Sequence, residues 1–167
     1  MTIEVGHKLP RGEFRTMSTE GVKVVQSEVF FAGRRIVLFA VPAVFTPGCT
    51  NNHLPSYIEN AEAILAKGFD EIACMSVSDA WVMDAWAREA GAGGKITMLA
   101  DGSASYAMAL GLELDLSHVG MGMRCKRFSM VVDDGYVQSL NVDERMIEAT
   151  SAPQTCGLKG MTSTKRE

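Results

Sequence analysis

The sequence lacks long hydrophobic runs and carries no excess of basic residues. Its apolar stretches are all shorter than the roughly 18 residues that a membrane-spanning helix requires, so we do not expect a membrane protein. Lys and Arg number 16 against 20 Asp and Glu, which gives a net charge of −4 and argues against binding to nucleic acid or to an anionic membrane surface. The opening residues, 1–17, are too polar for a signal peptide. We therefore expect a soluble protein of the cytoplasm.

Cysteine is scarce, and its few copies form no metal-binding pattern. No CxxC or CxxH pair occurs, so we expect no zinc site, no other metal and no cofactor. A chain of 167 residues can bury a sufficient core without disulfides, and a reducing compartment keeps thiols free. A cysteine in a conspicuous place is then a candidate reagent. The four cysteines are Cys49, Cys74, Cys125 and Cys156.

What the chain does contain is the composition of one ordinary globular domain. Hydrophobic residues make up 47% of it and charged residues 22%, which is enough apolar material to fill a core and enough charge to cover it. We expect a single domain over residues 1–160, followed by a flexible tail over 161–167.

Short apolar runs rich in β-branched residues alternate with segments of helical periodicity. The runs are too short for helices and apolar on both faces, as in strands buried within a sheet. Two later runs flank Asp133-Asp134-Gly135, which is typical of a β-hairpin. This order predicts a thioredoxin-like α/β fold, with a central mixed β-sheet flanked by helices and an N-terminal extension. We expect strands at 35–41, 71–77, 96–100, 127–132 and 136–142, helices at 49–67, 80–90, 104–110 and 151–158, and a short hairpin at 22–33.

The stretch VPAVFTPGC, residues 41–49, joins a predicted strand to a predicted helix through a tight corner. Thr46 suits the N-cap of that helix and Pro47 its first position, which places Cys49 in the first turn. There its sulfur faces free backbone N–H groups and the positive end of the helix dipole, which favour a thiolate over a thiol. The corner therefore favours a nucleophile, although an inert buried thiol in a turn remains an alternative.

Two residues near Cys49 modify this picture. Pro55 lacks the N–H that a helix interior needs, so we expect the first turns to be kinked or weakly held, which would let the sulfur swing out by local unfolding. His53 lies four residues after Cys49 and could share a metal with it. Since no second pair of ligands lies nearby in the sequence, a metal site is not expected.

The motif Pro42-x-x-x-Thr46-x-x-Cys49 resembles the active-site signature of the peroxiredoxins. Four further segments are similar, in the same order, to the type II, peroxiredoxin-5-like branch of that redoxin superfamily, and the resemblance covers about residues 3–152. It implies a thiol-dependent peroxidase. The segments are FTPGCTNNHLPSYIENAEAILAKG, IACMSVSDAWVM, LADGSASYAMALGLELDL and KRFSMVVDDGYVQSLNV.

The resemblance implies a role for each matching residue. Cys49 corresponds to the peroxidatic cysteine, whose thiolate attacks a peroxide and becomes a sulfenic acid. The Thr46 hydroxyl would face the sulfur and the peroxide, while the N–H groups of Gly48 and Cys49 hold the second oxygen. Arg127 would stabilise the thiolate and the developing charge, and Pro42 would shield the pocket from water. Without the resemblance, an ordinary surface charge at the start of a strand would be the better interpretation of Arg127.

Three routes could recycle the sulfenic acid. Cys74 lies 25 residues after Cys49, the spacing of the resolving cysteine in plant-type relatives, but it also suits a buried strand. Animal-type relatives carry a C-terminal resolving cysteine; here Ala149 stands at about that place, and Cys156 follows seven residues later. In the third route glutathione, glutaredoxin or thioredoxin attacks the sulfenic acid directly, and this is the route that we favour. Cys125 receives no role.

The resemblance also implies the partners. The substrates would be hydrogen peroxide and alkyl hydroperoxides, with the preference left open because Met121 and Met123 stand where some relatives have an aromatic residue. A homodimer through the face that carries the active-site helix is expected. Two other functions remain open: a peroxide-sensing thiol switch that regulates partners, and a purely structural thioredoxin-like module.

Overall fold

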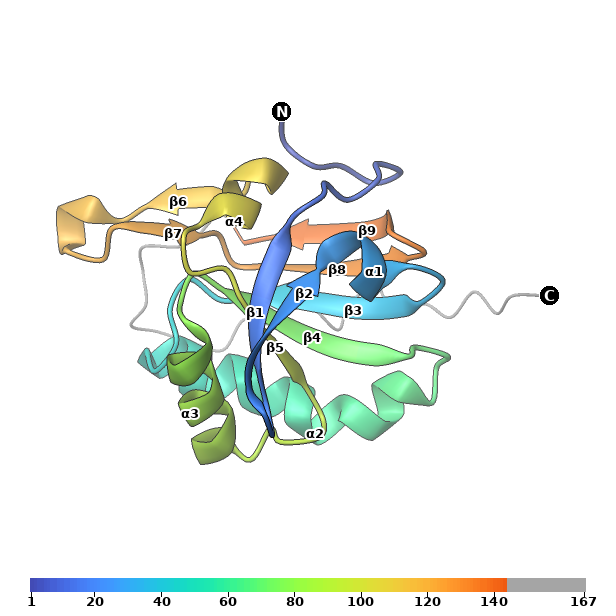
Figure 1. Ribbon diagram of the computed structural model, residues 1–167, viewed down its shortest axis with the longest axis horizontal. Helices are drawn as coiled ribbons and strands as arrows, with labels where there is room; N and C mark the ends of the chain where they lie inside the picture. The colour runs from blue at the N-terminus through green and yellow to red at the C-terminus, as the bar shows by residue number, and fades with distance from the viewer. Residues whose placement is uncertain (144–167) are drawn as a thin grey trace.

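The computed structural model describes residues 1–143, which form one seven-stranded mixed sheet with helices on both faces and a small two-stranded sheet beside it (Figure 1). The large sheet has the strand order β2-β1-β5-β4-β3-β8-β9, which confirms the predicted fold class. The strands are β1 (Glu13–Ser18), β2 (Gly21–Gln26), β3 (Arg35–Ala40), β4 (Glu71–Ser76), β5 (Thr97–Ala100), β6 (Glu113–Asp115), β7 (Met123–Cys125), β8 (Phe128–Asp133) and β9 (Tyr136–Val142). The helices are α1 (Ser27–Phe31), η1 (Cys49–His53), α2 (Leu54–Leu65), α3 (Ala80–Ala90), α4 (Ser105–Leu110) and η2 (Ser117–Val119).

The three central strands are the apolar runs that the sequence predicts. β3 pairs in parallel with β4, and β4 in parallel with β5, while β8 joins the other side of β3 in antiparallel register. All but the first residue of β3 and of β4 are buried, because helices cover both faces of this part of the sheet. The predicted hairpin of β8 and β9 is also present. Its turn residues Asp134 and Gly135 have φ of 49° and 77°, the left-handed conformation that a two-residue hairpin turn requires.

The N-terminal hairpin lies elsewhere than predicted. We expected it at 22–33, but β1 pairs with β2 around a turn that ends at Gly21, and residues Ser27–Phe31 form the helix α1. Tertiary contacts favour a helix over a strand here, because the Ser27 hydroxyl accepts a hydrogen bond from Gly12 N (2.9 Å) and donates one to the Pro10 carbonyl oxygen (3.0 Å). Those bonds fix the start of α1, and Phe31 is buried at its end.

Two apolar clusters lie on opposite faces of the sheet. On one face α2 and α3 pack together (Figure 1), where Phe39, Tyr57 and Trp86 belong to one cluster that also contains Cys49. On the other face α1, α4 and the N-terminal segment cover the cluster around Phe14. The predicted corner leaves the carboxyl end of β3 on the α2 face, so the sheet positions Cys49 between a buried strand end and a helix.

Two predicted segments lie outside the described residues. The expected helix at 151–158 and the expected tail at 161–167 both fall there, as does Cys156. Within residues 1–143, no helix is both long enough and apolar enough to cross a membrane.

Candidate active site

The corner between β3 and the following helix holds Cys49 as the sequence predicts. Helical backbone begins at Pro47, directly after Thr46. Phe45 has a φ of 61°, a left-handed conformation that a bulky residue rarely adopts and that lets the chain reverse sharply here. The side chain of Cys49 is buried, with 1% of the residue exposed. The sulfur therefore stands inside the first helical turn and away from bulk water.

That first turn is wider than an α-helix. Residues Cys49–His53 form a π-helical turn, closed by a bond from the N–H of Leu54 to the carbonyl oxygen of Cys49. The regular helix α2 starts only at Leu54, so Pro55 is its second residue and directly follows the π-turn. The irregularity that Pro55 predicts is thus present, in the form of a π-turn that contains Cys49.

Arg127 provides a positive charge directly at the sulfur. Its Nη2 donates to Cys49 Sγ at 3.4 Å, and a second guanidinium nitrogen, Nη1, lies 4.0 Å from Oδ2 of Asp143. β8 begins opposite the end of β3, with Phe128 in register with Ala40, which explains why the residue just before β8 reaches the corner. The planar, permanently charged guanidinium is thus held within hydrogen-bond distance of the sulfur.

The other predicted site residues surround the same corner. A Cβ atom on Gly48 would lie 3.7 Å from Nη2 of Arg127, so the backbone of Gly48 borders the guanidinium. The Thr46 hydroxyl donates to the carbonyl oxygen of Ala43 at 3.0 Å, which braces the turn. Pro42 is half-buried directly after β3. Their roles toward a peroxide remain predictions.

The remaining described cysteines are buried and neutral. Cys74 has no exposed surface, sits in β4 between Phe39 and Met98 of the neighbouring strands, and burial raises the pKa of its thiol well above the ordinary value. Burial likewise raises the pKa of Cys125 to about 12. Both therefore stay protonated near neutral pH, and neither is a ready nucleophile.

His53 is part of an aromatic cluster. Its ring lies 6.4 Å from that of Phe39 and 6.2 Å from that of Tyr57, and the latter two rings stack at 3.8 Å. Across residues 1–143, no three His, Cys, Asp or Glu side chains come together in a way that could hold a metal ion.

Three hydrogen bonds at the corner were not foreseen from the sequence. The indole N–H of Trp86, on α3, donates to the hydroxyl of Thr50 at 3.0 Å. The carbonyl oxygen of Val41 accepts from the Ser76 hydroxyl at 3.0 Å and from the Cys125 thiol at 3.3 Å. No local sequence pattern indicates these partners, because they belong to segments far apart in the chain.

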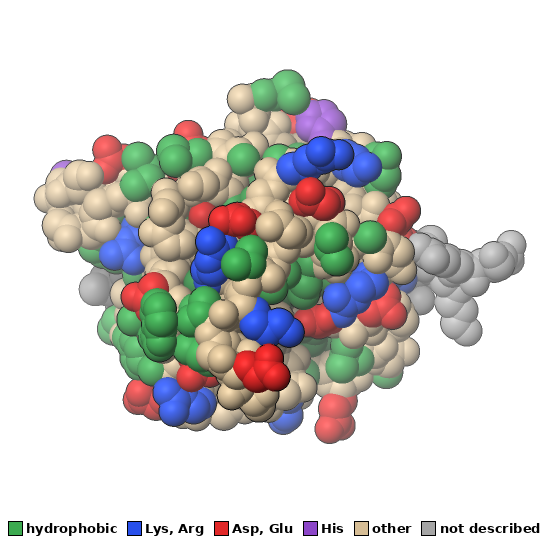
Figure 2. All heavy atoms as spheres, in the orientation of Figure 1, with side chains coloured by type: hydrophobic (Ala, Val, Ile, Leu, Met, Phe, Trp, Pro, Cys, Tyr) green, Lys and Arg blue, Asp and Glu red, His purple; other side chains and the backbone are tan. Residues whose placement is uncertain are grey.

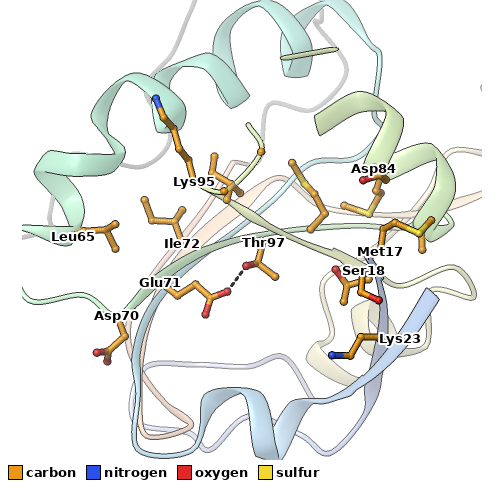
Figure 3. Close-up of a pocket in the computed structure, with 17 residues that line it drawn as sticks. Met17, Ser18, Lys23, Leu65, Asp70, Glu71, Ile72, Asp84, Lys95 and Thr97 are labelled. Atoms are coloured by element: carbon orange, nitrogen blue, oxygen red, sulfur yellow. Dashed lines mark hydrogen bonds between the residues drawn. The ribbon is translucent and has the colours of Figure 1, made fainter. Parts of the chain in front are cut away.

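A cavity of about 510 Å³ opens at the amino ends of β4 and β5, the end of these strands remote from the corner. Figure 3 shows Lys23, Lys95 and Asp84 around it and the hydrogen bond from Thr97 to Glu71. None of the predicted site residues lines this cavity, and we assign it no part in the chemistry of Cys49.

Comparisons with known proteins place the chain in a family. The Redoxin family matches residues 4–153. The chain is 44% identical over 158 residues to peroxiredoxin-2E-2, chloroplastic, of Oryza sativa subsp. japonica, covering 92% of this chain and 70% of that protein. It is 42% identical over 147 residues to peroxiredoxin-2E, chloroplastic, of Arabidopsis thaliana, covering 86% of this chain and 63% of that protein.

A solved structure is similar as well. The reduced Prx3 of Vibrio vulnificus, determined in complex with hydrogen peroxide, superposes with a TM-score of 0.84 at 44% identity. The match covers 87% of this chain and 90% of that one.

Proposed function

The chain belongs to the Redoxin family as a peroxiredoxin of the type II kind, and from this premise we propose that it reduces hydrogen peroxide and alkyl hydroperoxides through Cys49. The observation that carries the proposal is the position of the Arg127 guanidinium, 3.4 Å from the buried sulfur of Cys49. A sulfur placed beside a fixed cation, in the first turn of a helix, is suited to act as a thiolate nucleophile.

The proposed reaction is a displacement at oxygen. The thiolate of Cys49 attacks one oxygen of the peroxide, a sulfur–oxygen bond forms and the oxygen–oxygen bond breaks. The sulfur gives up two electrons and becomes a sulfenic acid, while the second oxygen takes up a proton and leaves as water or an alcohol. Arg127 faces the negative charge that develops on that oxygen. In the proposal Thr46 and the N–H groups of Gly48 and Cys49 orient the peroxide, and Pro42 keeps water out.

We propose that an external thiol completes the cycle. A glutathione or thioredoxin thiolate attacks the sulfenic sulfur, hydroxide leaves as water, and a second thiol, from glutaredoxin or thioredoxin, reduces the resulting disulfide. Support comes from the burial of Cys74, whose thiol is held within β4 between two paired strands. A disulfide requires Cα atoms within about 7 Å and a suitable approach of the two side chains, so resolution by Cys74 would disturb the central sheet. Cys156 lies outside the described residues and remains a candidate.

A homodimer is the proposed assembly. Large apolar side chains are exposed at the end of the molecule that carries the corner: Phe45 by 46%, Trp81 by 65% and Val119 by 58%. Figure 2 shows hydrophobic side chains gathered over α3, the helix that contains Trp81. Exposed aromatic residues of this kind favour a protein interface.

The cytoplasm is the proposed location, because a reducing compartment supplies the thiols that the cycle consumes. The two plant relatives are named as chloroplastic proteins, so cell fractionation with an antibody against this chain is the appropriate test. Recovery in an organelle fraction would refute this part of the proposal.

The decisive experiment measures peroxide consumption by the parent and by Cys49→Ser, with glutathione and glutaredoxin or with thioredoxin and its reductase. Many equivalents consumed per subunit by the parent, and none by the variant, support a peroxidase. One equivalent followed by a lasting conformational change would instead indicate a thiol switch, and an equally active Cys49→Ser would refute the assignment of the nucleophile.

A further inference from the structure

The peptide group of Val41 is held from both sides immediately before the catalytic corner. Its N–H donates to the carbonyl oxygen of Met75 at 3.1 Å. Its carbonyl oxygen accepts from Ser76 Oγ at 3.0 Å and from Cys125 Sγ at 3.3 Å. All of these partners are buried, where a hydrogen bond is not weakened by competing water.

Of these partners, Cys125 is also tied to the catalytic arginine. It ends β7 and stands two residues before Arg127, with the N–H of Lys126 between them bonded to Leu112 O at 2.7 Å. Its side chain therefore reaches the start of the corner that carries Cys49, while its main chain leads directly to the guanidinium. The two segments that must meet at 3.4 Å are joined through this one residue.

We infer that Cys125 is a positioning residue of the peroxide step: together with Ser76 it fixes the Val41 carbonyl, and so holds the Cys49 corner and Arg127 in register. The inference rests on the proposed peroxidase function and deepens it. In this inference Cys125 acts neither as the nucleophile nor as the resolving cysteine, but only as a hydrogen-bond donor.

The thiol of Cys125 is chemically suited to act as a hydrogen-bond donor. Burial raises the pKa of Cys125, so that its thiol remains a hydrogen-bond donor near neutral pH. A donor this deeply buried is also protected from peroxide, since oxidation needs thiolate character and access. Arg124, next to it, donates from Nη1 to the Val77 carbonyl oxygen at 3.0 Å, which fastens β7 to the end of β4 from a second point.

The test compares Cys125→Ala, which removes the donor, with Cys125→Ser, which restores a donor of similar size. Two quantities are measured on reduced protein: the single-turnover rate with hydrogen peroxide, and the pH profile of Cys49 alkylation, which needs no peroxide. Loss of one buried hydrogen bond predicts a rate about threefold to tenfold lower in Cys125→Ala and an alkylation profile moved to higher pH. Cys125→Ser should return both to within about twofold of the parent.

Serines supply a matched control pair. Ser76→Ala should reproduce the effect of Cys125→Ala. Ser129 is equally buried, and its hydroxyl has no hydrogen-bond partner within the part of the chain that the structure describes, so Ser129→Ala should leave both quantities unchanged. Should Cys125→Ala fail to fold, the two serine variants decide the question.

Two results would overturn the inference. One is a parent-like rate and pH profile in Cys125→Ala or, where that variant does not fold, in Ser76→Ala. The other is a Cys125→Ser variant as impaired as Cys125→Ala, because side-chain volume rather than donation would then be the cause. A parent protein that consumes no peroxide would overturn the proposed function instead, and the alkylation profiles would still report whether the corner has moved.

Discussion

The indole nitrogen of Trp86 lies 3.0 Å from the hydroxyl oxygen of Thr50, the residue that follows Cys49, and donates a hydrogen bond to it. Trp86 belongs to α3 and is fully buried. The helix α3 thus holds the π-turn that carries the sulfur. The first prediction concerns this hydrogen bond.

Replacement of Trp86 by Phe should loosen the turn. The variant keeps an aromatic ring in the core but loses the donor and part of the packing, so we expect the free energy of unfolding to fall by about 1 to 3 kcal/mol. Amide hydrogen exchange should speed up over residues 49–54 more than in β3 or β4. Mass spectrometry of exchange resolves these segments, and equal protection in parent and variant would contradict the prediction.

Replacement of Arg127 by Ala should slow the reaction of Cys49 with peroxide by about 10² to 10³-fold, because the charge that faces the thiolate and the departing oxygen is lost. Circular dichroism should show an intact fold, since the side chain is partly exposed at the edge of the corner. Arg127→Lys, which keeps the charge without the planar fork, should lie between parent and Ala. A stopped-flow measurement gives all three rates, and a parent-like rate in Arg127→Ala would exclude the proposed role.

One equivalent of hydrogen peroxide followed by glutathione should yield a mixed disulfide on Cys49. Peptide mass mapping separates this adduct from the Cys49–Cys74 and Cys49–Cys156 disulfides. The burial of Cys74 and its raised pKa predict that the Cys49–Cys74 bridge stays absent unless the protein is denatured first. Its formation at native stability would show that β4 opens during the cycle, contrary to the external-thiol proposal.

Alkaline pH should weaken the fold through the buried thiols. Cys125 ionises at about 12 in the folded protein against an ordinary pKa of 9.0, and the pKa of Cys74 is raised in the same direction. Above pH 9 the unfolded chain therefore releases thiol protons that the folded protein retains. The contribution of these thiols to the free energy of unfolding is complete below pH 9 and declines as the pH rises.

Urea unfolding under reducing conditions, at about pH 8 and about pH 10.5, measures this loss. The limiting slope is about 1.4 kcal/mol per pH unit for each thiol. Cys125→Ser carries no ionisable group there, and its stability should fall less steeply than that of the parent. Equal slopes would mean that Cys125 does not contribute.

Local patterns in the sequence were sufficient for the central strands and for the corner. Apolar β-branched runs locate β3 and β4, and the preferences of Thr and Pro at helix starts locate the turn that holds Cys49. The pairing of Cys49 with Arg127 is different in kind, because 78 residues separate them. It was anticipated from the resemblance to the peroxiredoxins and not from any property of the arginine itself.

What could not be anticipated depends on contacts between distant segments. The alternation of residues 22–33 suggested a hairpin, but the Ser27 hydroxyl binds Gly12 and Pro10, and these bonds turn the second half into α1. Similarly, the donors to the Val41 carbonyl lie 35 and 84 residues away. No short pattern specifies such partners, because only the folded sheet brings them together.

The π-turn around Cys49 contains one residue more than an α-helical turn. An α-helical turn would close with a bond from Leu54 N to Thr50 O in place of the bond to Cys49 O. Conversion to that bond would rotate Cys49 by about 100° around the axis relative to α2, while α2 from Leu54 onward keeps its register. We expect such a slip of one residue to accompany the attack of a thiol on an oxidised Cys49, and a structure of the oxidised form would show it as that exchanged bond.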